Sequence, residues 1–155
     1  MKPEAVIIGG GLAGAATAAL LAAQGREVLL LEKEPIPHHK VCGEFISWEA
    51  VHYLGQLGID LPALGAQPID KLHLGFGEHS VHTDLSFRAW SLSRLKLDQA
   101  VLAIAKERGA SIRCGNAVTA LKQESDGWLV ETIEGSIHTP TVFLASGKSD
   151  LRDWP

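Results

Sequence analysis

A glycine-rich turn between two apolar segments near the N-terminus limits the possible folds of this chain more than any other feature. An apolar run at 5–8 leads into consecutive glycines at 9–11, and an alanine-rich segment from 12 to about 24 predicts a helix. A second apolar run at 27–31 ends on Glu32. Strand, glycine turn, helix, strand and acid is the order that a dinucleotide-binding βαβ unit requires.

The residues of this unit have separate mechanical roles. Gly9 allows the tight turn after the first strand, Gly11 lets the backbone approach a pyrophosphate, and Gly14 lets the helix lie close to the sheet. The helix N-terminus offers N–H groups and partial positive charge to the phosphates. Glu32 is placed to accept hydrogen bonds from a ribose and to repel a 2′-phosphate, which favours FAD or NAD over NADP. A βαβ unit that binds no ligand is the alternative.

Composition narrows the class of protein. A chain of 155 residues with 46% hydrophobic content fits one domain with a proper core. The formal charge of -4 gives no reason to expect nucleic acid or an anionic membrane as partner. No apolar segment reaches the length of a membrane span. Cys42 and Cys114 form no CxxC pair, which indicates a reducing, cytoplasmic setting.

The middle of the chain predicts two helices with strands between them. Ser47 is placed to cap a helix over 48–58. Alternating apolar residues between 69 and 92 indicate two or three short strands. Ser93 is placed to cap a helix over 94–108, which Gly109 would end. The apolar residues expected to be buried on this helix are Leu97, Val101, Ile104 and Ala105.

The last third of the chain predicts strands only. A short strand at 111–114 is followed by an antiparallel meander over 117–124, 128–133 and 136–139. The apolar run 141–145 predicts a further buried strand of the parallel sheet. The expected fold class is therefore α/β, Rossmann-like, with a mainly parallel sheet and a three-stranded antiparallel meander covering one side.

The histidines do not predict a metal site. His38 and His39 are adjacent, and neighbouring side chains in an extended segment point apart. His79 and His82 are three residues apart on a predicted strand, which places them on opposite faces. We therefore expect no metal ligands.

Four segments occur in an order that resembles a known family. They are the glycine-rich opening, KVCGEFIS, SRLKLDQAVLAIAKERGA and TVFLASGKSDLR. Together they resemble the N-terminal FAD-binding domain of the flavoprotein monooxygenase superfamily, nearest the branch of geranylgeranyl reductases and flavin-dependent halogenases. The resemblance spans nearly the whole chain, so 1–155 is expected to be one FAD-binding domain.

The resemblance implies a set of residues that contact FAD. The pyrophosphate would be lined by Gly9, Gly11, Leu12, Ala13 and Gly14, and the adenosine ribose by Glu32 and Lys33. The flavin side would be approached by Lys40, Cys42 and Gly43, and the phosphate or ribityl region by Arg94. The adenine edge would meet Val118, and a second glycine motif would contain Gly147.

Cys42 has two interpretations. It could lie over the isoalloxazine and tune its redox chemistry, or it could be a small, semi-buried side chain in a tight loop. Arg94 has a clearer interpretation, because an arginine at a helix start gains nothing from the helix dipole and therefore indicates an anionic partner.

The resemblance also implies an activity. A flavin reduced by NAD(P)H would either activate O₂ for hydroxylation or halogenation, or reduce a carbon–carbon double bond. The substrate would be a small molecule, lipid-like or aromatic. Ser146 replaces the acid of the family's Asp-Gly motif, which weakens the expectation of an NADPH-dependent hydroxylase. The family's third motif, a Gly-Asp, lies downstream of Pro155, so we expect the N-terminal part of a larger flavoenzyme with no assignable catalytic residue.

Two rival functions differ from this one. A non-catalytic module that holds ADP-like ligands is compatible with the same motifs. An NAD-dependent dehydrogenase domain is disfavoured by KVCGE and by the meander, since an NAD domain would continue with alternating strands and helices. A homodimer that completes the flavin site is a further expectation.

Overall fold

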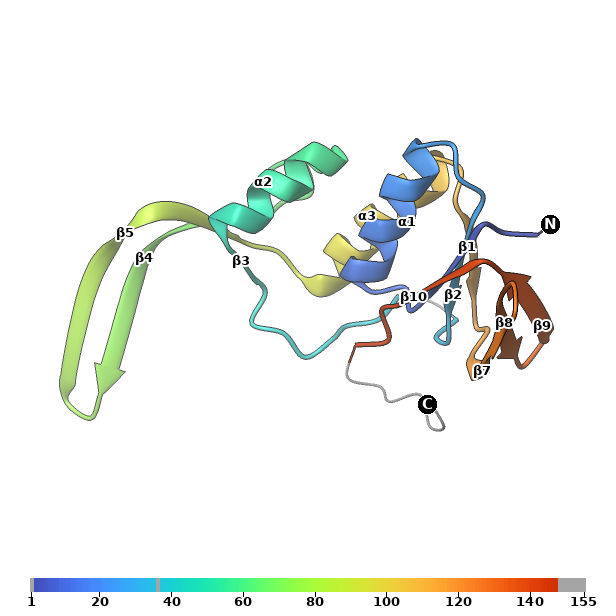
Figure 1. The fold of residues 1–155 in the computed structure, drawn as a ribbon. Helices are drawn as coiled ribbons and strands as arrows, with labels where there is room; N and C mark the ends of the chain where they lie inside the picture. The colour runs from blue at the N-terminus through green and yellow to red at the C-terminus, as the bar shows by residue number, and fades with distance from the viewer. Residues whose placement is uncertain (1, 36, 148–155) are drawn as a thin grey trace. The chain divides into compact units, whose positions relative to one another are not determined.

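The computed structural model describes residues 2–35 and 37–147, which form two compact units (Figure 1). The first, the sheet unit, comprises 1–38 and 97–155. The second, the hairpin unit, comprises 39–96. None of the helices in the described ranges is long and apolar enough to cross a membrane.

The sheet unit is built on a four-stranded sheet with the order β10-β1-β2-β6. All neighbouring strands in it are parallel, as the sequence predicted. Its strands are β1 (Ala5–Ile8), β2 (Val28–Glu32), β6 (Ser111–Cys114) and β10 (Thr141–Leu144). Ile8 pairs with Leu31 and with Leu144, so the carboxyl ends of three strands lie at one edge of the sheet.

Helix α1 (Leu12–Ala23) packs against β1 and β2 with a face of small side chains. Side chains alternate across a strand, so Ile7 and Leu30 point to the side opposite that of Val6 and Leu29. The alanines of α1 are short enough to bring the helix close to the sheet. Its buried residues are Gly14, Ala15, Ala18, Ala19 and Ala22.

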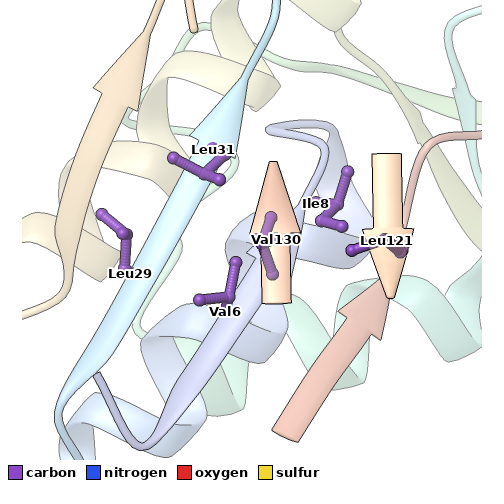
Figure 2. Packing of buried hydrophobic residues seen from close by; sticks show 6 residues of the cluster. All are labelled: Val6, Ile8, Leu29, Leu31, Leu121 and Val130. Carbon is purple, nitrogen blue, oxygen red and sulfur yellow. The ribbon is translucent and has the colours of Figure 1, made fainter. Parts of the chain in front are cut away.

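The antiparallel meander covers the other face of the sheet, as predicted. It consists of β7 (Val118–Glu124), β8 (Gly127–Thr132) and β9 (Gly135–Thr139) in sequential order. Figure 2 shows the cluster that joins the meander to the sheet. Two of its side chains come from the meander and four from β1 and β2: Leu121, Val130, Val6, Ile8, Leu29 and Leu31. This apolar layer fixes β1 and β2, whose ends carry the glycine turn and Glu32.

The prediction that 141–145 forms a buried strand is wrong about burial. β10 pairs with β1 on one side only and is an edge strand of the described sheet. Val142 packs against the core cluster, but Phe143 is 38% exposed and Leu144 46% exposed. An apolar run indicates a strand, but it does not reveal whether a neighbour covers both faces.

Helix α3 (Arg94–Glu107) follows the predicted pattern closely. Ser93 Oγ accepts a hydrogen bond from the Lys96 N–H at 3.4 Å, as expected for an N-cap. Leu97, Val101 and Ala105 are buried as predicted; Ile104 is only half-buried.

The hairpin unit contains α2 (Trp48–Leu57) and a three-stranded antiparallel sheet of order β3-β5-β4. Ser47 Oγ accepts from the Ala50 N–H at 3.4 Å, which confirms the predicted cap. The prediction of two or three short strands between 69 and 92 is right about the strands but wrong about their length, because β4 (Gln67–Phe76) and β5 (His79–Ser91) form one long hairpin. The third strand of the sheet, β3 (Phe45–Ile46), pairs with the end of β5.

Only the base of this hairpin is buried. Ile46, Leu57, Ala89 and Leu92 form a small core there. Beyond it the two strands continue as an exposed ribbon (Figure 1). The ribbon turns at Gly77, whose φ of 58° is the left-handed conformation that glycine adopts without strain.

Candidate dinucleotide-binding site

The glycine turn lies at the carboxyl end of β1, where the topology of the sheet changes direction. The chain leaves β1 for β2 on one side, and β10 lies on the other. The Gly9 N–H donates to Leu31 O at 2.8 Å, and the Ala145 N–H donates to Ile8 O at 2.8 Å. In open parallel sheets, ligands bind at such a switch point, outside the carboxyl ends of the strands.

Two glycines of the turn are required by the fold itself. Gly9 has a φ of 109°, and a Cβ on it would overlap the backbone carbonyl of Ala145. A Cβ on Gly14 would overlap the carbonyl oxygen of Gly9. These positions therefore hold the turn, the start of α1 and the end of β10 in close contact.

Gly11 is different, because its backbone does not require glycine. Its φ of -72° and ψ of -177° form an extended conformation open to any residue. Gly11 is the N-cap of α1, it provides no capping side chain, and the first turn of the helix contains no acidic residue. Within the described part of the chain, neither the N-cap residue nor an acid of the first turn accepts from the N–H groups of that turn, an arrangement suited to an anion.

Glu32 is held against the glycine turn by two backbone hydrogen bonds. The Gly10 N–H donates to Glu32 Oε2 at 2.5 Å, and the Glu34 N–H donates to Oε1 at 2.9 Å. A Cβ on Gly10 would lie 3.0 Å from the Glu32 Cβ, so Gly10 also makes room for this side chain. A carboxylate has about four acceptor positions, so Glu32 retains capacity for further donors.

Cys114 and Asn116 lie beside Glu32 and were missed by the sequence analysis as parts of this region. Cys114 pairs with Glu32 across β2 and β6. Cys114 is exposed as a residue, but partial desolvation of its thiol raises the pKa, and the negative charge of Glu32 raises it further.

Asn116 is a buried polar residue that ties the end of β6 to the meander. Its N–H donates to Glu32 O at 3.0 Å, and its Nδ2 donates to Glu134 Oε2 at 2.8 Å. Its Oδ1 is buried and has no hydrogen-bond partner among the described residues. The only sequence signal was an asparagine that follows a glycine directly after a strand, which is too common to indicate a role.

The other predicted residues divide between the two units. In the sheet unit, Val118 is half-buried at the start of β7, and Lys33 is exposed. Gly147 has a φ of 68°, two residues after Ala145, whose backbone adjoins Gly9. The structure thus brings together the glycine turn, Glu32 and the end of β10.

The predicted flavin-side residues belong to the hairpin unit, and their approach to the cofactor stays a prediction. Cys42 is exposed rather than semi-buried, and its Sγ accepts the Glu44 N–H at 3.4 Å. Glu44 has a φ of 56°, uncommon for a non-glycine residue. Arg94 is half-buried, and Lys40 is likewise half-buried.

A groove of the sheet unit is a separate feature. It is an open groove of about 890 Å³ along α3 and β6, lined by Leu102, Lys106, Ile112 and Arg113 among others. Neither the glycine turn nor Glu32 lines it. Within the described part of the chain, no three His, Cys, Asp or Glu side chains are grouped as metal ligands.

A parallel sheet with a glycine turn, an uncapped helix N-terminus and an acid at the next strand end defines the class of dinucleotide-binding domains. The sequence matches the family described as FAD binding domain over residues 2–135. The chain belongs to this family, as the sequence resemblance predicted.

Relatives and solved structures agree with this assignment. The chain is 32% identical over 133 residues to a menaquinone reductase of Mycobacterium tuberculosis, covering 79% of this chain and 31% of the relative. It is 26% identical over 163 residues to Protein FixC of Bradyrhizobium diazoefficiens, covering 96% and 37%. The myxobacterial chondrochloren halogenase CndH, an FAD-dependent halogenase, has a similar fold, with a TM-score of 0.82, 23% identity and coverage of 96% and 38%. The chain thus spans about a third of the length of these proteins.

Proposed function

We propose that the glycine turn and Glu32 hold the ADP half of FAD. The contrast between Gly11 and the other two glycines of the motif, Gly9 and Gly14, supports this proposal. Gly9 and Gly14 are explained by backbone contacts, while Gly11 has an ordinary extended conformation and lies at an uncapped helix N-terminus. A pyrophosphate that accepts from the first N–H groups of α1 accounts for a glycine there.

The residues of this region fit the remaining parts of the adenosine. Glu32 retains acceptor capacity for the ribose hydroxyls, and the exposed Lys33 next to it is proposed to contact the same ribose. Val118, at the start of β7, would meet the adenine edge through its backbone. The Gly10–Glu32 hydrogen bond fixes the carboxylate before the ligand arrives, which lowers the entropy cost of binding.

The domain would position the flavin rather than carry out the redox step. Bound flavin supplies hydride and electron transfer, and the protein supplies binding, orientation and electrostatics. Lys40, Cys42 and Arg94 are proposed to approach the flavin side of the cofactor, with the Arg94 guanidinium binding a phosphate or the ribityl region.

We infer that the domain serves a flavin-dependent oxidoreductase whose flavin is reduced by NAD(P)H. The 32% identical relative is named a menaquinone reductase, and this name favours a reductase that acts on a lipid-like substrate. Hydroxylation or halogenation of an aromatic compound is the second candidate, favoured by the fold shared with CndH. The two free cysteines suit a reducing, cytoplasmic setting.

Isothermal titration of FAD, ADP and AMP into the 155-residue chain tests the proposed site. We expect ADP to bind and to compete with FAD, and AMP to bind at least about tenfold more weakly because it lacks one of the two phosphates of the pyrophosphate. Equal affinity for AMP and ADP would contradict the pyrophosphate assignment. A folded chain that binds neither FAD nor ADP would contradict the site as a whole.

A further inference from the structure

The outer part of the β4–β5 hairpin has two chemically different faces. Residues directly opposite one another in an antiparallel pair point to the same face. One face is mainly apolar: it contains Leu72, Leu74, Phe76 and Val81, all exposed, together with Thr83 and His79. The opposite face is polar and contains Lys71, His73, Gly75, Ser80, His82 and Asp84.

Two histidines form a close pair in the middle of the polar face. His73 on β4 is the direct partner of His82 on β5. Their rings are stacked, with centroids 4.0 Å apart and an interplanar angle of 17°. Both residues are exposed, so their ring nitrogens can be reached from solvent. In the sequence His82 is near His79, which points to the other face, and only the pairing of the two strands brings His82 beside His73.

We propose that His73 and His82 form a two-histidine site for a divalent transition metal such as Zn²⁺, Cu²⁺ or Ni²⁺. A metal–nitrogen bond of about 2.0–2.1 Å and a tetrahedral angle place two ligating nitrogens roughly 3.3 Å apart. The stacked rings lie with their centroids 4.0 Å apart and their planes nearly parallel, so both side chains must rotate about χ1 and χ2 for a nitrogen of each to reach one ion, and the exposure of both residues leaves room for that rotation. Neutral imidazole is a ligand that all three of these ions accept.

The surroundings of the pair leave room for the other ligands of the ion. On one side the next cross-strand pair is Gly75 and Ser80, and Gly75 has no side chain to block water. On the other side the next pair is Lys71 and Asp84. The Asp84 carboxylate adds negative charge beside the site, while Lys71 opposite it offsets part of that charge. Two protein ligands with water in the remaining positions predict moderate affinity in the order Cu²⁺ above Ni²⁺ and Zn²⁺.

A metal at this place would join the two arms of the exposed ribbon. One ligand comes from each strand, and the ribbon beyond the core at its base has little burial to hold it together. An ion that binds the folded hairpin more tightly than the unfolded chain raises the stability of the hairpin by mass action. The inference does not depend on the proposed ADP-binding residues, because the glycine turn and Glu32 belong to the sheet unit.

The experiment is a titration of Cu²⁺, Ni²⁺, Zn²⁺ and Mg²⁺ into the untagged 155-residue chain by calorimetry, in a non-chelating buffer. We expect one site for the three transition metals and none for Mg²⁺. His73→Asn and His82→Asn should each weaken binding at least tenfold, whereas His79→Asn, on the opposite face, should bind as the unsubstituted chain does. Far-ultraviolet circular dichroism checks that each variant is folded.

A second measurement separates this site from scattered binding to other histidines. Addition of Zn²⁺ should raise the melting temperature of the unsubstituted chain and of His79→Asn, and the rise should be lost in His73→Asn and His82→Asn. Metal binding that persists in both of these variants would overturn the proposal. Equal weakening by His79→Asn would do so as well, because it would place the ion elsewhere.

Discussion

The carbonyl oxygen of Gly9 occupies the space into which a Cβ on Gly14 would project. This contact joins the end of the first strand to the first turn of α1 and involves backbone atoms, which cannot move aside as a flexible side chain can. Because Gly14 is also buried, the helix cannot shift outward without losing its packing on the sheet. The third glycine of the motif is therefore a requirement of the fold before any ligand is bound.

Gly14→Ala should destabilise the protein strongly. The added methyl group would force α1 away from β1, at a cost on the order of 3 kcal/mol in the free energy of unfolding. Gly55→Ala is the matched control, because Gly55 is in helix α2 and a Cβ there meets nothing within 4 Å. That variant should gain about 0.5–1 kcal/mol from helix propensity. Urea denaturation of both variants measures the difference, and equal stabilities would contradict the role of the Gly9–Gly14 contact.

Gly11→Val should leave the fold intact and abolish tight binding of the nucleotide. The extended backbone at Gly11 suits a β-branched residue, but the side chain would occupy the place proposed for the pyrophosphate. We expect the affinity for ADP and FAD to fall more than about tenfold, which corresponds to ~1.4 kcal/mol. Calorimetry on the variant, with its melting temperature measured in parallel, tests this. Unchanged affinity in a folded protein would mean that this glycine serves only the turn.

The sequence predicted the sheet unit well because its signals are local. The apolar runs of β1 and β2 and the glycine turn between them each act within a few positions of the chain, and the structure has them as expected. The hydrogen bond between Gly10 and Glu32 links residues 22 apart, and no local pattern encodes it. The sequence could place Glu32 at the end of a strand but could not show that its carboxylate already accepts two backbone N–H groups.

The hairpin unit was predicted less well for a physical reason. The length of a strand is inferred from the alternation of apolar and polar residues, which arises because one face of the strand is buried. Most of β4 and β5 is exposed, so this signal is weak there. Pairing across the hairpin also decides which histidines are neighbours, and the register of two strands is set by the turn at Gly77 rather than by either strand alone. The same limit applies to β10, whose apolar composition suggested a covered strand.

Glu32→Gln should reduce discrimination against a 2′-phosphate. The carboxylate repels a phosphate on the ribose, and the neutral amide removes that charge while its oxygen retains one of the two backbone hydrogen bonds. We expect the unsubstituted chain to bind ADP-ribose better than 2′-phospho-ADP-ribose, and the ratio of the two affinities to decrease severalfold in the variant. A competition assay against FAD gives both constants. A chain that prefers the phosphorylated ligand would overturn the ribose assignment.

Asn116→Asp should destabilise the protein at neutral pH and less so in acid. The substitution replaces the Nδ2 donor with an oxygen that faces Glu134 Oε2, so a part-buried donor–acceptor pair becomes two acceptors with like charge. The loss of a hydrogen bond that leaves its partner unsatisfied lowers the free energy of unfolding by about 1–3 kcal/mol. Protonation of the new carboxyl would restore a donor, so the deficit relative to the unsubstituted chain should shrink as pH falls. Asn116→Ala, which adds no charge, is the control and should show no such recovery.

The reactivity of Cys114 should report the charge on Glu32. The thiolate is the reactive form of cysteine, and both burial and the Glu32 carboxylate raise the pKa of the Cys114 thiol, with burial the larger cause. In a Cys42→Ser background, alkylation of Cys114 by iodoacetamide should be slow at neutral pH and should rise only as pH passes the raised pKa.

Glu32→Gln in the same background removes the charge but not the burial. Its rate profile should therefore move to lower pH and still lie above that of an unperturbed cysteine. High salt should move the profile of the Glu32 protein in the same direction and barely affect the Gln variant, because screening weakens only the charge. Coincident profiles in the two proteins would show that burial alone controls this thiol.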